Sequence, residues 1–212
     1  MAVSVGLCST LSCTKKSGAP TPTGEDGPDA DATAAPRHLG ALPKDLSEIS
    51  LTPKEKGAMR ILAFGKKIPV DFNWAKDRES MTLELWADEE RIDREVFAES
   101  AAGIALVDGS DSAFNPPIPL LPKSGAVTGS VAWKGASRFN NLNLAGEAKV
   151  SYQPDTATVG IDQVSGLRVQ VDLTVDTGKG TSKRVFKYWF SPGLGLVKRD
   201  IEKGVSIERS DL

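Results

Sequence analysis

The side chains that most often perform catalysis or bind metals are few in this sequence of 212 residues. His38 is the only histidine, and both cysteines, Cys8 and Cys13, lie before any predicted structural element. A Ser-His-Asp arrangement or a cysteine-based zinc site is therefore not expected in the body of the chain. Phosphate-loop, Gly-x-Ser-x-Gly and His-Glu-x-x-His motifs are also missing from the sequence. The sequence predicts no catalytic residue, no metal site and no cofactor, and we expect a protein that is not an enzyme.

Two acidic clusters contain the remaining groups that could act chemically. Carboxylates at Asp88–Glu90 and Asp108–Asp111 could serve glycoside hydrolysis or bind calcium. Neither cluster has the ligand spacing of a calcium loop, and aspartate is common in turns. We interpret both clusters as solvated turns and keep a hydrolase as the weakest alternative.

Aromatic residues offer a different chemistry, because pockets for apolar ligands are often lined by aromatic side chains. The same residues could equally fill a core. Trp86 is out of phase with the apolar positions of its own predicted strand. Three consecutive aromatics at 188–190 cannot all face one side of a strand. Our candidates for binding a lipid or other apolar ligand are Trp86, Trp133, Tyr188 and Trp189.

The elements that would position these residues are β-strands. Residues 166–176 alternate apolar and polar side chains, which is typical of an antiparallel strand with one buried face. Pro192 and Gly193 suit a type II turn, so residues 188–201 predict a hairpin. For residues 91–100 we favour a strand over a helix, with Ile92, Arg94, Val96 and Ala98 on one face. The sequence predicts an all-β, mainly antiparallel fold of about ten strands, with at most one or two short helices.

Residues 115–122 contain four prolines and cannot form a helix. Because proline interrupts a central ladder, we expect this segment to pack across an open end of the sheet. A Pro-x-x-Pro ligand for a partner domain is the alternative interpretation.

Composition limits the class of protein. Hydrophobic residues make up 40% of the chain and charged residues 25%, with a formal net charge of -2. These values describe a globular domain without the basic surface that a nucleic-acid partner would require. We expect a single β domain at residues 41–212.

The N-terminal region resembles the end of a bacterial lipoprotein signal, in which a short apolar segment precedes an acylated cysteine. Leu11 stands two residues before Cys13, and residues 14–40 are rich in small and polar side chains. We interpret residues 1–13 as a truncated signal whose start lies upstream, Cys13 as the lipidation site, and residues 14–40 as a disordered linker. An ordinary disordered tail with two incidental cysteines would look similar.

The segment from Tyr188 to Lys198, together with the proline-rich residues 118–122, Gly125 and Trp133, resembles exported bacterial β-proteins of uncharacterised function. These are envelope lipoproteins similar to lipoprotein carriers, built on a curved antiparallel half-barrel. The resemblance implies a protein of the bacterial cell envelope, tethered to a membrane through its N-terminal anchor, whose curved sheet holds a lipid or other apolar ligand. The alternative is an interaction module with a filled core and an unknown protein partner.

Overall fold

The computed structural model describes residues 35–51, 56–78, 80–109, 112–139, 141–201 and 204–212. They belong to one compact unit, Ala35–Leu212. Its only described helix is a short 3-10 turn, η1 (Leu46–Glu48). The strands are β1 (His38–Gly40), β2 (Lys56–Ala63), β3 (Lys66–Asp77), β4 (Ser80–Ala87), β5 (Glu90–Ser100), β6 (Gly103–Gly109), β7 (Ser112–Pro122), β8 (Gly129–Phe139), β9 (Leu142–Val159), β10 (Asp162–Asp176), β11 (Thr181–Ser191), β12 (Gly195–Ile201) and β13 (Val205–Arg209).

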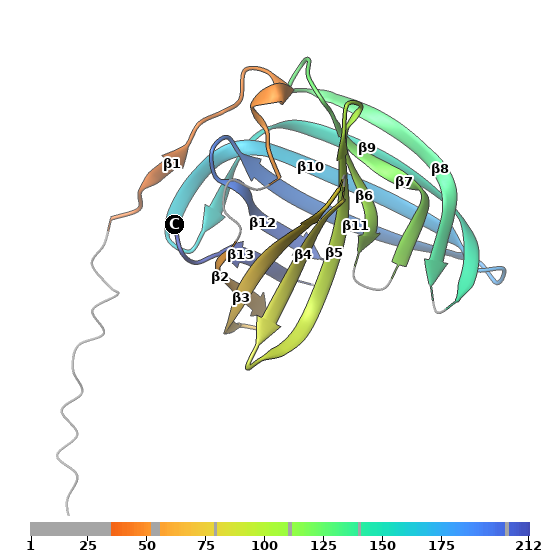
Figure 1. Cartoon of the computed structure of the whole chain (residues 1–212), viewed down its shortest axis with the longest axis horizontal. Coiled ribbons are helices and arrows are strands. Elements are labelled where there is room, and N and C mark those ends of the chain that lie inside the picture. The colour runs from red at the N-terminus through yellow and green to blue at the C-terminus, as the bar shows by residue number, and fades with distance from the viewer. Residues whose placement is uncertain (1–34, 52–55, 79, 110–111, 140, 202–203) are drawn as a thin grey trace, which may run out of the picture. The chain divides into compact units, whose positions relative to one another are not determined.

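The strands form one closed barrel (Figure 1). From β2 to β13 each strand pairs antiparallel with the next, and β13 returns to pair with β2. β1 is added in parallel to the outer part of β10. The all-β, antiparallel prediction is confirmed, but the prediction of a half-barrel of about ten strands is wrong. The twelve strands β2–β13 close on themselves because Ser206–Arg209 pair with residues 59–62.

The antiparallel order gives the barrel two different ends. The turns β2–β3, β4–β5, β6–β7, β8–β9, β10–β11 and β12–β13 lie at one end, which we name the hairpin end. The segment 41–51 crosses the other end, which we name the capped end. There Leu46 donates its N–H to the Gly125 carbonyl, while the Leu51 carbonyl accepts from Leu196. Leu46, Ile49 and Leu51 are buried in the core, so this segment closes one end of the barrel.

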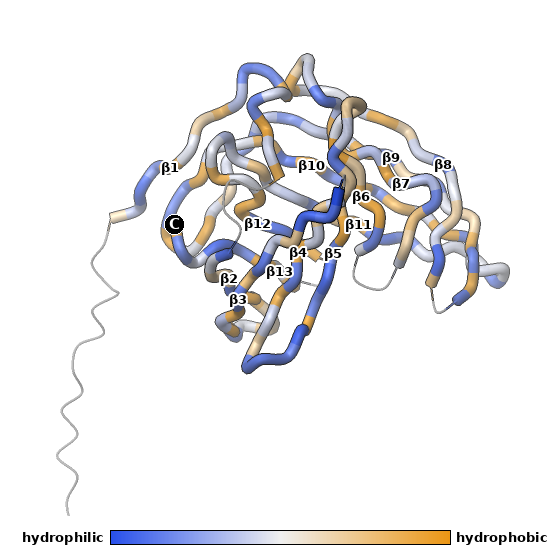
Figure 2. Tube along the Cα trace, viewed as in Figure 1, coloured by the Kyte–Doolittle hydropathy of each residue, from blue (hydrophilic) through white to orange (hydrophobic). Residues whose placement is uncertain are grey.

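The barrel interior is filled by apolar side chains. They come from every second position of the strands, as the alternating colours along the tube show (Figure 2). Phe97 lies near the centre, where its ring is 5.8 Å from that of Trp74 and 6.1 Å from that of Tyr188. All three side chains are buried. The barrel is therefore a packed core and not an open tube.

A second, smaller core lies outside the barrel. The end of the β9–β10 hairpin lies against the outer face of β11, β12 and β13, where Gly160 donates its N–H to Glu208. β10 separates from β11 at Gly166, because the pairing between the two strands begins only at Leu167. The apolar residues buried there are Ala157, Val159, Val164, Trp189 and Val197.

The proline-rich segment belongs to the sheet, which corrects our expectation that it packs across an open end. Residues 112–122 form β7, with a cis peptide bond between Asn115 and Pro116. β7 pairs with β8 only at Ser112–Asn115, so the part of β7 that contains the prolines makes no hydrogen-bonded ladder with β8. A strand with one unpaired side tolerates the missing N–H groups.

Local predictions agree with the structure. The hairpin at residues 188–201 is formed by β11 and β12, and Gly193 has the positive φ of 74° that its turn requires. Residues 91–100 lie in β5, as favoured over a helix. His38–Gly40 form β1 within the compact unit, although we had assigned them to the linker. Residues 1–34, and Cys13 with them, lie outside the described residues.

Candidate functional site

A cluster of polar side chains is buried inside the barrel. We name Asp93, Glu95, Tyr188 and Arg199 the buried polar cluster. Tyr188 donates its hydroxyl to Glu95 Oε1 at 3.0 Å, and Arg199 Nη2 lies 3.0 Å from the same oxygen. Arg199 Nη1 donates to Asp93 Oδ2 at 2.7 Å. The cluster therefore joins β5 to β11 and β12 across the interior.

The electrostatics of this cluster depend on burial. Loss of water around Glu95 raises the pKa of its carboxyl to about 7, although Arg199 opposes the shift. Burial and the neighbouring Glu95 also raise the pKa of Tyr188. Glu95 Oε2 is buried and has no hydrogen-bond partner among the described residues. These bonds hold facing walls of the barrel together.

Glu95 should make the stability of the protein depend on pH. Its pKa is higher in the folded state than the usual 4.5, so the folded protein binds more protons between these values. The free energy of unfolding should consequently fall as the pH rises from about 4.5 to about 7. Glu95→Gln should remove this dependence. Across that pH range, the free energy of unfolding of the variant should rise relative to that of the wild type by up to about 3 kcal/mol. Urea denaturation of both proteins at several pH values measures the difference, and parallel curves would contradict the assignment.

The hairpin end contains a small apolar pocket inside the barrel wall. Its volume is about 130 Å³. Arg184 lies over the ring of Phe139, with 5.5 Å between the guanidinium carbon and the ring centroid. The pocket is lined by Ser112, Ser137, Phe139, Leu144, Leu173, Val175, Thr177, Ser182 and Arg184. It is smaller than the roughly 300–1,000 Å³ of most ligand sites, so it has no room for a whole lipid.

Exposed apolar side chains surround this end. Phe64 is 87% exposed at the β2–β3 turn, and Leu142 is 60% exposed where β9 begins. Ile68 in β3 and Ile92, which lies in β5 just after the β4–β5 turn, are also exposed. We name these four residues the apolar rim. Monomeric proteins commonly expose single apolar residues. Two further exposed apolar residues lie away from this end, Leu42 in the segment at the capped end and Ile161 at the β9–β10 turn.

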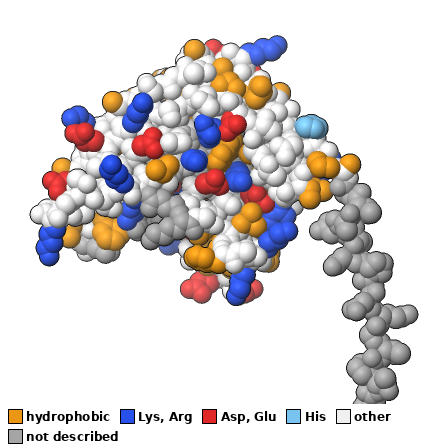
Figure 3. Space-filling model, turned by 180° about the vertical axis from the view of Figure 1, so that it is seen from behind, with side chains coloured by type: hydrophobic (Ala, Val, Ile, Leu, Met, Phe, Trp, Pro, Cys, Tyr) orange, Lys and Arg blue, Asp and Glu red, His pale blue; other side chains and the backbone are white. Residues whose placement is uncertain are grey.

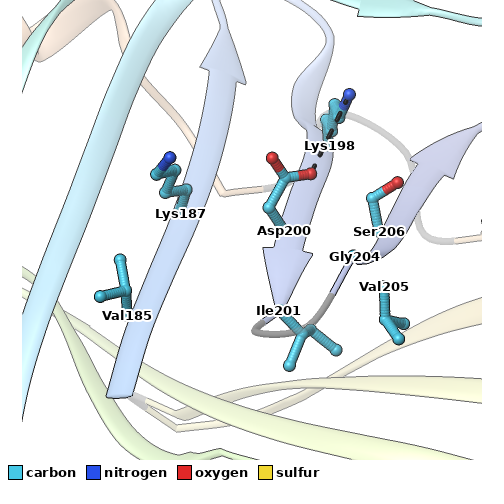
Figure 4. A pocket seen from close by; sticks show the side chains of 8 residues that line it. All are labelled: Val185, Lys187, Lys198, Asp200, Ile201, Gly204, Val205 and Ser206. Carbon is cyan, nitrogen blue, oxygen red and sulfur yellow. Dashed lines mark ion pairs between the residues drawn. The ribbon is translucent and has the colours of Figure 1, made fainter. Parts of the chain in front are cut away.

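A further pocket, of about 350 Å³, lies on the outer face of β11, β12 and β13 (Figure 4). Asp200 lies between Lys187 and Lys198, and Lys198 Nζ is 3.9 Å from Asp200 Oδ1. Burial raises the pKa of Asp200, while the two lysines oppose the shift. Lys198 also donates to the Thr158 carbonyl and lies 5.7 Å from the ring centroid of Trp189. The charge of Lys198 is thus already engaged.

The structure separates the four aromatic residues that the sequence nominated. Tyr188 belongs to the buried polar cluster, and Trp133 is buried in the main core, where its Nε1 donates to the Pro116 carbonyl at 2.8 Å. Trp189 lies in the outer core and donates to Asp155 at 3.1 Å. Trp86 is partly exposed and lines a pocket of about 380 Å³ beside β2 and β3. The four residues do not form one binding site.

Sequence reasoning missed Glu95 and Arg199. We predicted that Ile92, Arg94, Val96 and Ala98 lie on one face of β5. The side chains that reach the interior are Asp93, Glu95 and Phe97. Because two carboxylates lie on the inward face, β5 does not show the alternation of apolar and polar residues on which the prediction relied. Three consecutive charged residues, 93–95, with Arg91 close by, give no local signal that one of them is buried.

Within the described ranges, no group of acidic, histidine and cysteine side chains could hold a metal ion. The described part of the chain also contains no helix that is long and apolar enough to span a membrane. The Asp88–Glu90 cluster lies at the β4–β5 turn, as interpreted from the sequence. Positive and negative side chains are interspersed on the face shown in Figure 3.

The fold and these sites define an all-β protein: a filled, closed antiparallel barrel with one capped end and one end surrounded by exposed apolar residues. Among solved structures, the chain is similar to a putative exported protein with YmcC-like fold from Bacteroides fragilis. The two are 11% identical, with a TM-score of 0.32, and the match covers 82% of this chain and 98% of that one. It is also similar to a putative lipoprotein from Parabacteroides distasonis, with 8% identity, a TM-score of 0.39, and coverage of 76% and 94%.

These similarities are distant, and TM-scores of 0.32 and 0.39 support no conclusion about function. No family model matches the sequence, and no curated protein matches it. The functional argument therefore depends on the residues of this chain.

Proposed function

We propose that this chain is a non-enzymatic protein of the bacterial cell envelope that binds other envelope components through its surface. The observation that carries the proposal is the contrast between a filled barrel interior and the exposed apolar rim at the hairpin end. A filled core leaves the surface as the place where binding can occur. The lipoprotein-like segment before Cys13, followed by a polar stretch, supports an anchor at the N-terminal side of the domain.

This proposal shares the filled core with the second of the two functions that the sequence left open, but does not restrict the partner to a protein. A carrier needs an interior volume matched to an acyl chain, and the pocket at the hairpin end measures only about 130 Å³. A cavity of about 150 Å³ holds a molecule the size of benzene. Binding of a small apolar group in that pocket is compatible with its size, whereas storage of a complete lipid is not.

Native mass spectrometry of the full chain, followed by organic extraction, tests whether the interior holds a ligand. We expect the apo mass, no extracted lipid, and no one-to-one complex after addition of palmitic acid. Val175→Trp, which fills the pocket at the hairpin end, serves as the matched variant. A lipid that co-purifies with the wild type and is absent from Val175→Trp would establish an interior site and overturn the proposal.

A further inference from the structure

The tip of the β2–β3 hairpin exposes an aromatic side chain at a cost to the fold. Phe64 is 87% exposed, more than any other large apolar residue described. Its φ is 51° and that of Gly65 is 76°. Two successive positive φ values are typical of a two-residue hairpin turn for which Asn-Gly is preferred, and a bulky residue is rarely found there. Asn would suit this turn better, so the fold alone does not account for a phenylalanine.

Within its own hairpin, the charges next to Phe64 in the sequence are of one sign. Lys66 and Lys67 follow Gly65 in the same hairpin and are exposed. The sequence contains no acidic residue between Arg60 and Val70. Arg60 is paired with Glu208 at 2.7 Å, so the positive charge of the tip comes from the two lysines. An exposed aromatic ring beside two lysines is chemically complementary to a surface that is apolar inside and anionic outside.

The hairpin is also free to approach such a surface. Pairing between β3 and β4 ends at Asp71 and Trp86, so the β3 residues 66–70 have no partner on the β4 side. Leu62 is the last β2 residue paired with β13. Toward β4 the hairpin is therefore unpaired over residues 66–70, whereas toward β13 only Ala63 and the turn extend past the pairing. We name residues 63–70 the β2–β3 arm. The adjacent β4–β5 turn carries the acidic residues Asp88–Glu90, which an anionic surface would repel. Attraction to such a surface is therefore limited to the β2–β3 arm.

We propose that this arm docks the domain onto an anionic phospholipid bilayer, with Phe64 inserted at the boundary between headgroups and acyl chains. Lys66 and Lys67 then contact lipid phosphates, and the hairpin end faces the membrane. Aromatic and basic residues together are typical of segments that lie in a membrane interface. This inference rests on the proposed envelope function and specifies the partner that the apolar rim meets.

One aromatic residue and two lysines bind a bilayer only weakly. An anchored domain, however, meets its own membrane at an effective concentration in the millimolar range, depending on linker length. Weak docking is then sufficient to orient the barrel without irreversible insertion. The anchor holds the protein at the membrane, and the arm determines which end faces it.

Sedimentation of the full chain with lipid vesicles at low ionic strength tests the proposal. The vesicles contain phosphatidylcholine alone or phosphatidylcholine with phosphatidylglycerol. Phe64→Asn should lower the partition coefficient on anionic vesicles by at least about tenfold, the effect of losing a buried phenylalanine. Lys66→Gln combined with Lys67→Gln should lower it by about 25-fold, at about fivefold per lysine. Replacing anionic lipid with neutral lipid should weaken wild-type binding similarly.

Leu42→Asn is the matched control, because Leu42 is 51% exposed in the segment at the capped end. It should bind like the wild type. Thermal melting should show that Phe64→Asn is at least as stable as the wild type, since Asn suits the turn. Wild-type binding that is absent, equal on both kinds of vesicle, or unchanged in Phe64→Asn would overturn the docking proposal. The mass-spectrometry result is independent of these outcomes, so docking can fail while the proposed surface function stands.

Discussion

Arg199→Ala is expected to lower the free energy of unfolding by about 3–5 kcal/mol, the usual loss when one partner of a buried ion pair is removed. The arginine side chain is 3% exposed and is the cation shared by Asp93 and Glu95. Its removal leaves both carboxylates in the barrel without a counter-charge. Urea denaturation at about pH 8 measures the loss. Near pH 5.5 the loss should be smaller, because Glu95, with a pKa of about 7, can then take up a proton.

A salt bridge on the surface provides the control for this prediction. Lys134 and Glu147 are 2.6 Å apart, but their side chains are 78% and 67% exposed. Lys134→Ala should therefore change the free energy of unfolding by less than about 1 kcal/mol. If Arg199→Ala behaves like Lys134→Ala at both pH values, the buried polar cluster does not hold the barrel walls together.

Gly166→Ala is expected to destabilise the protein by about 3 kcal/mol, the upper part of the range for overpacked positions. A Cβ at this position would lie 2.3 Å from the Phe190 carbonyl oxygen and 3.1 Å from the Ser191 Cα. Both are backbone atoms, so neither can move aside as a flexible side chain would. β10 would have to shift away from β11 at the point where the β9–β10 end turns toward the outer core. Denaturation gives the loss, and hydrogen exchange should show faster exchange at this end of β10.

Gly109→Ala is the matched control, since it is also a glycine within a strand. The nearest atom to its Cβ would be Glu95 Oε1, at 3.4 Å, which is ordinary contact. We expect a loss of less than about 1 kcal/mol, similar to other mild substitutions. Equal effects of the two substitutions would show that the approach of β10 to β11 at Gly166 is not tight.

The sequence by itself determined the kind of secondary structure and several local elements. The alternation at residues 166–176 depends on a period of two and needs no knowledge of neighbouring strands. Pro192 and Gly193 restrict their own backbone angles, so the β11–β12 turn could be predicted from two residues. Pro69 lies in the part of β3 without a β4 partner, where a proline is tolerated. Such features are encoded within a few residues.

Residue environments were less predictable, because they depend on which face of a strand is covered. Trp189 lies on the outer side of β11, where only the arrival of the β9–β10 end makes an apolar residue favourable. Glu95 faces the interior because Arg199 and Tyr188, more than ninety residues away in the sequence, supply its charge and hydrogen bond. No pattern within β5 contains that information.

Closure of the barrel was decided by the tertiary structure alone. It requires β13 to pair with β2, at positions such as Ile207 and Ile61, which are far apart along the chain. The residues of neither strand distinguish an open sheet from a closed one. Curvature and twist summed over all the strands bring these two edges together, and that sum cannot be derived from any single segment. Because closure fills the interior with side chains, the proposed binding surface is the exposed apolar rim and not a concave sheet.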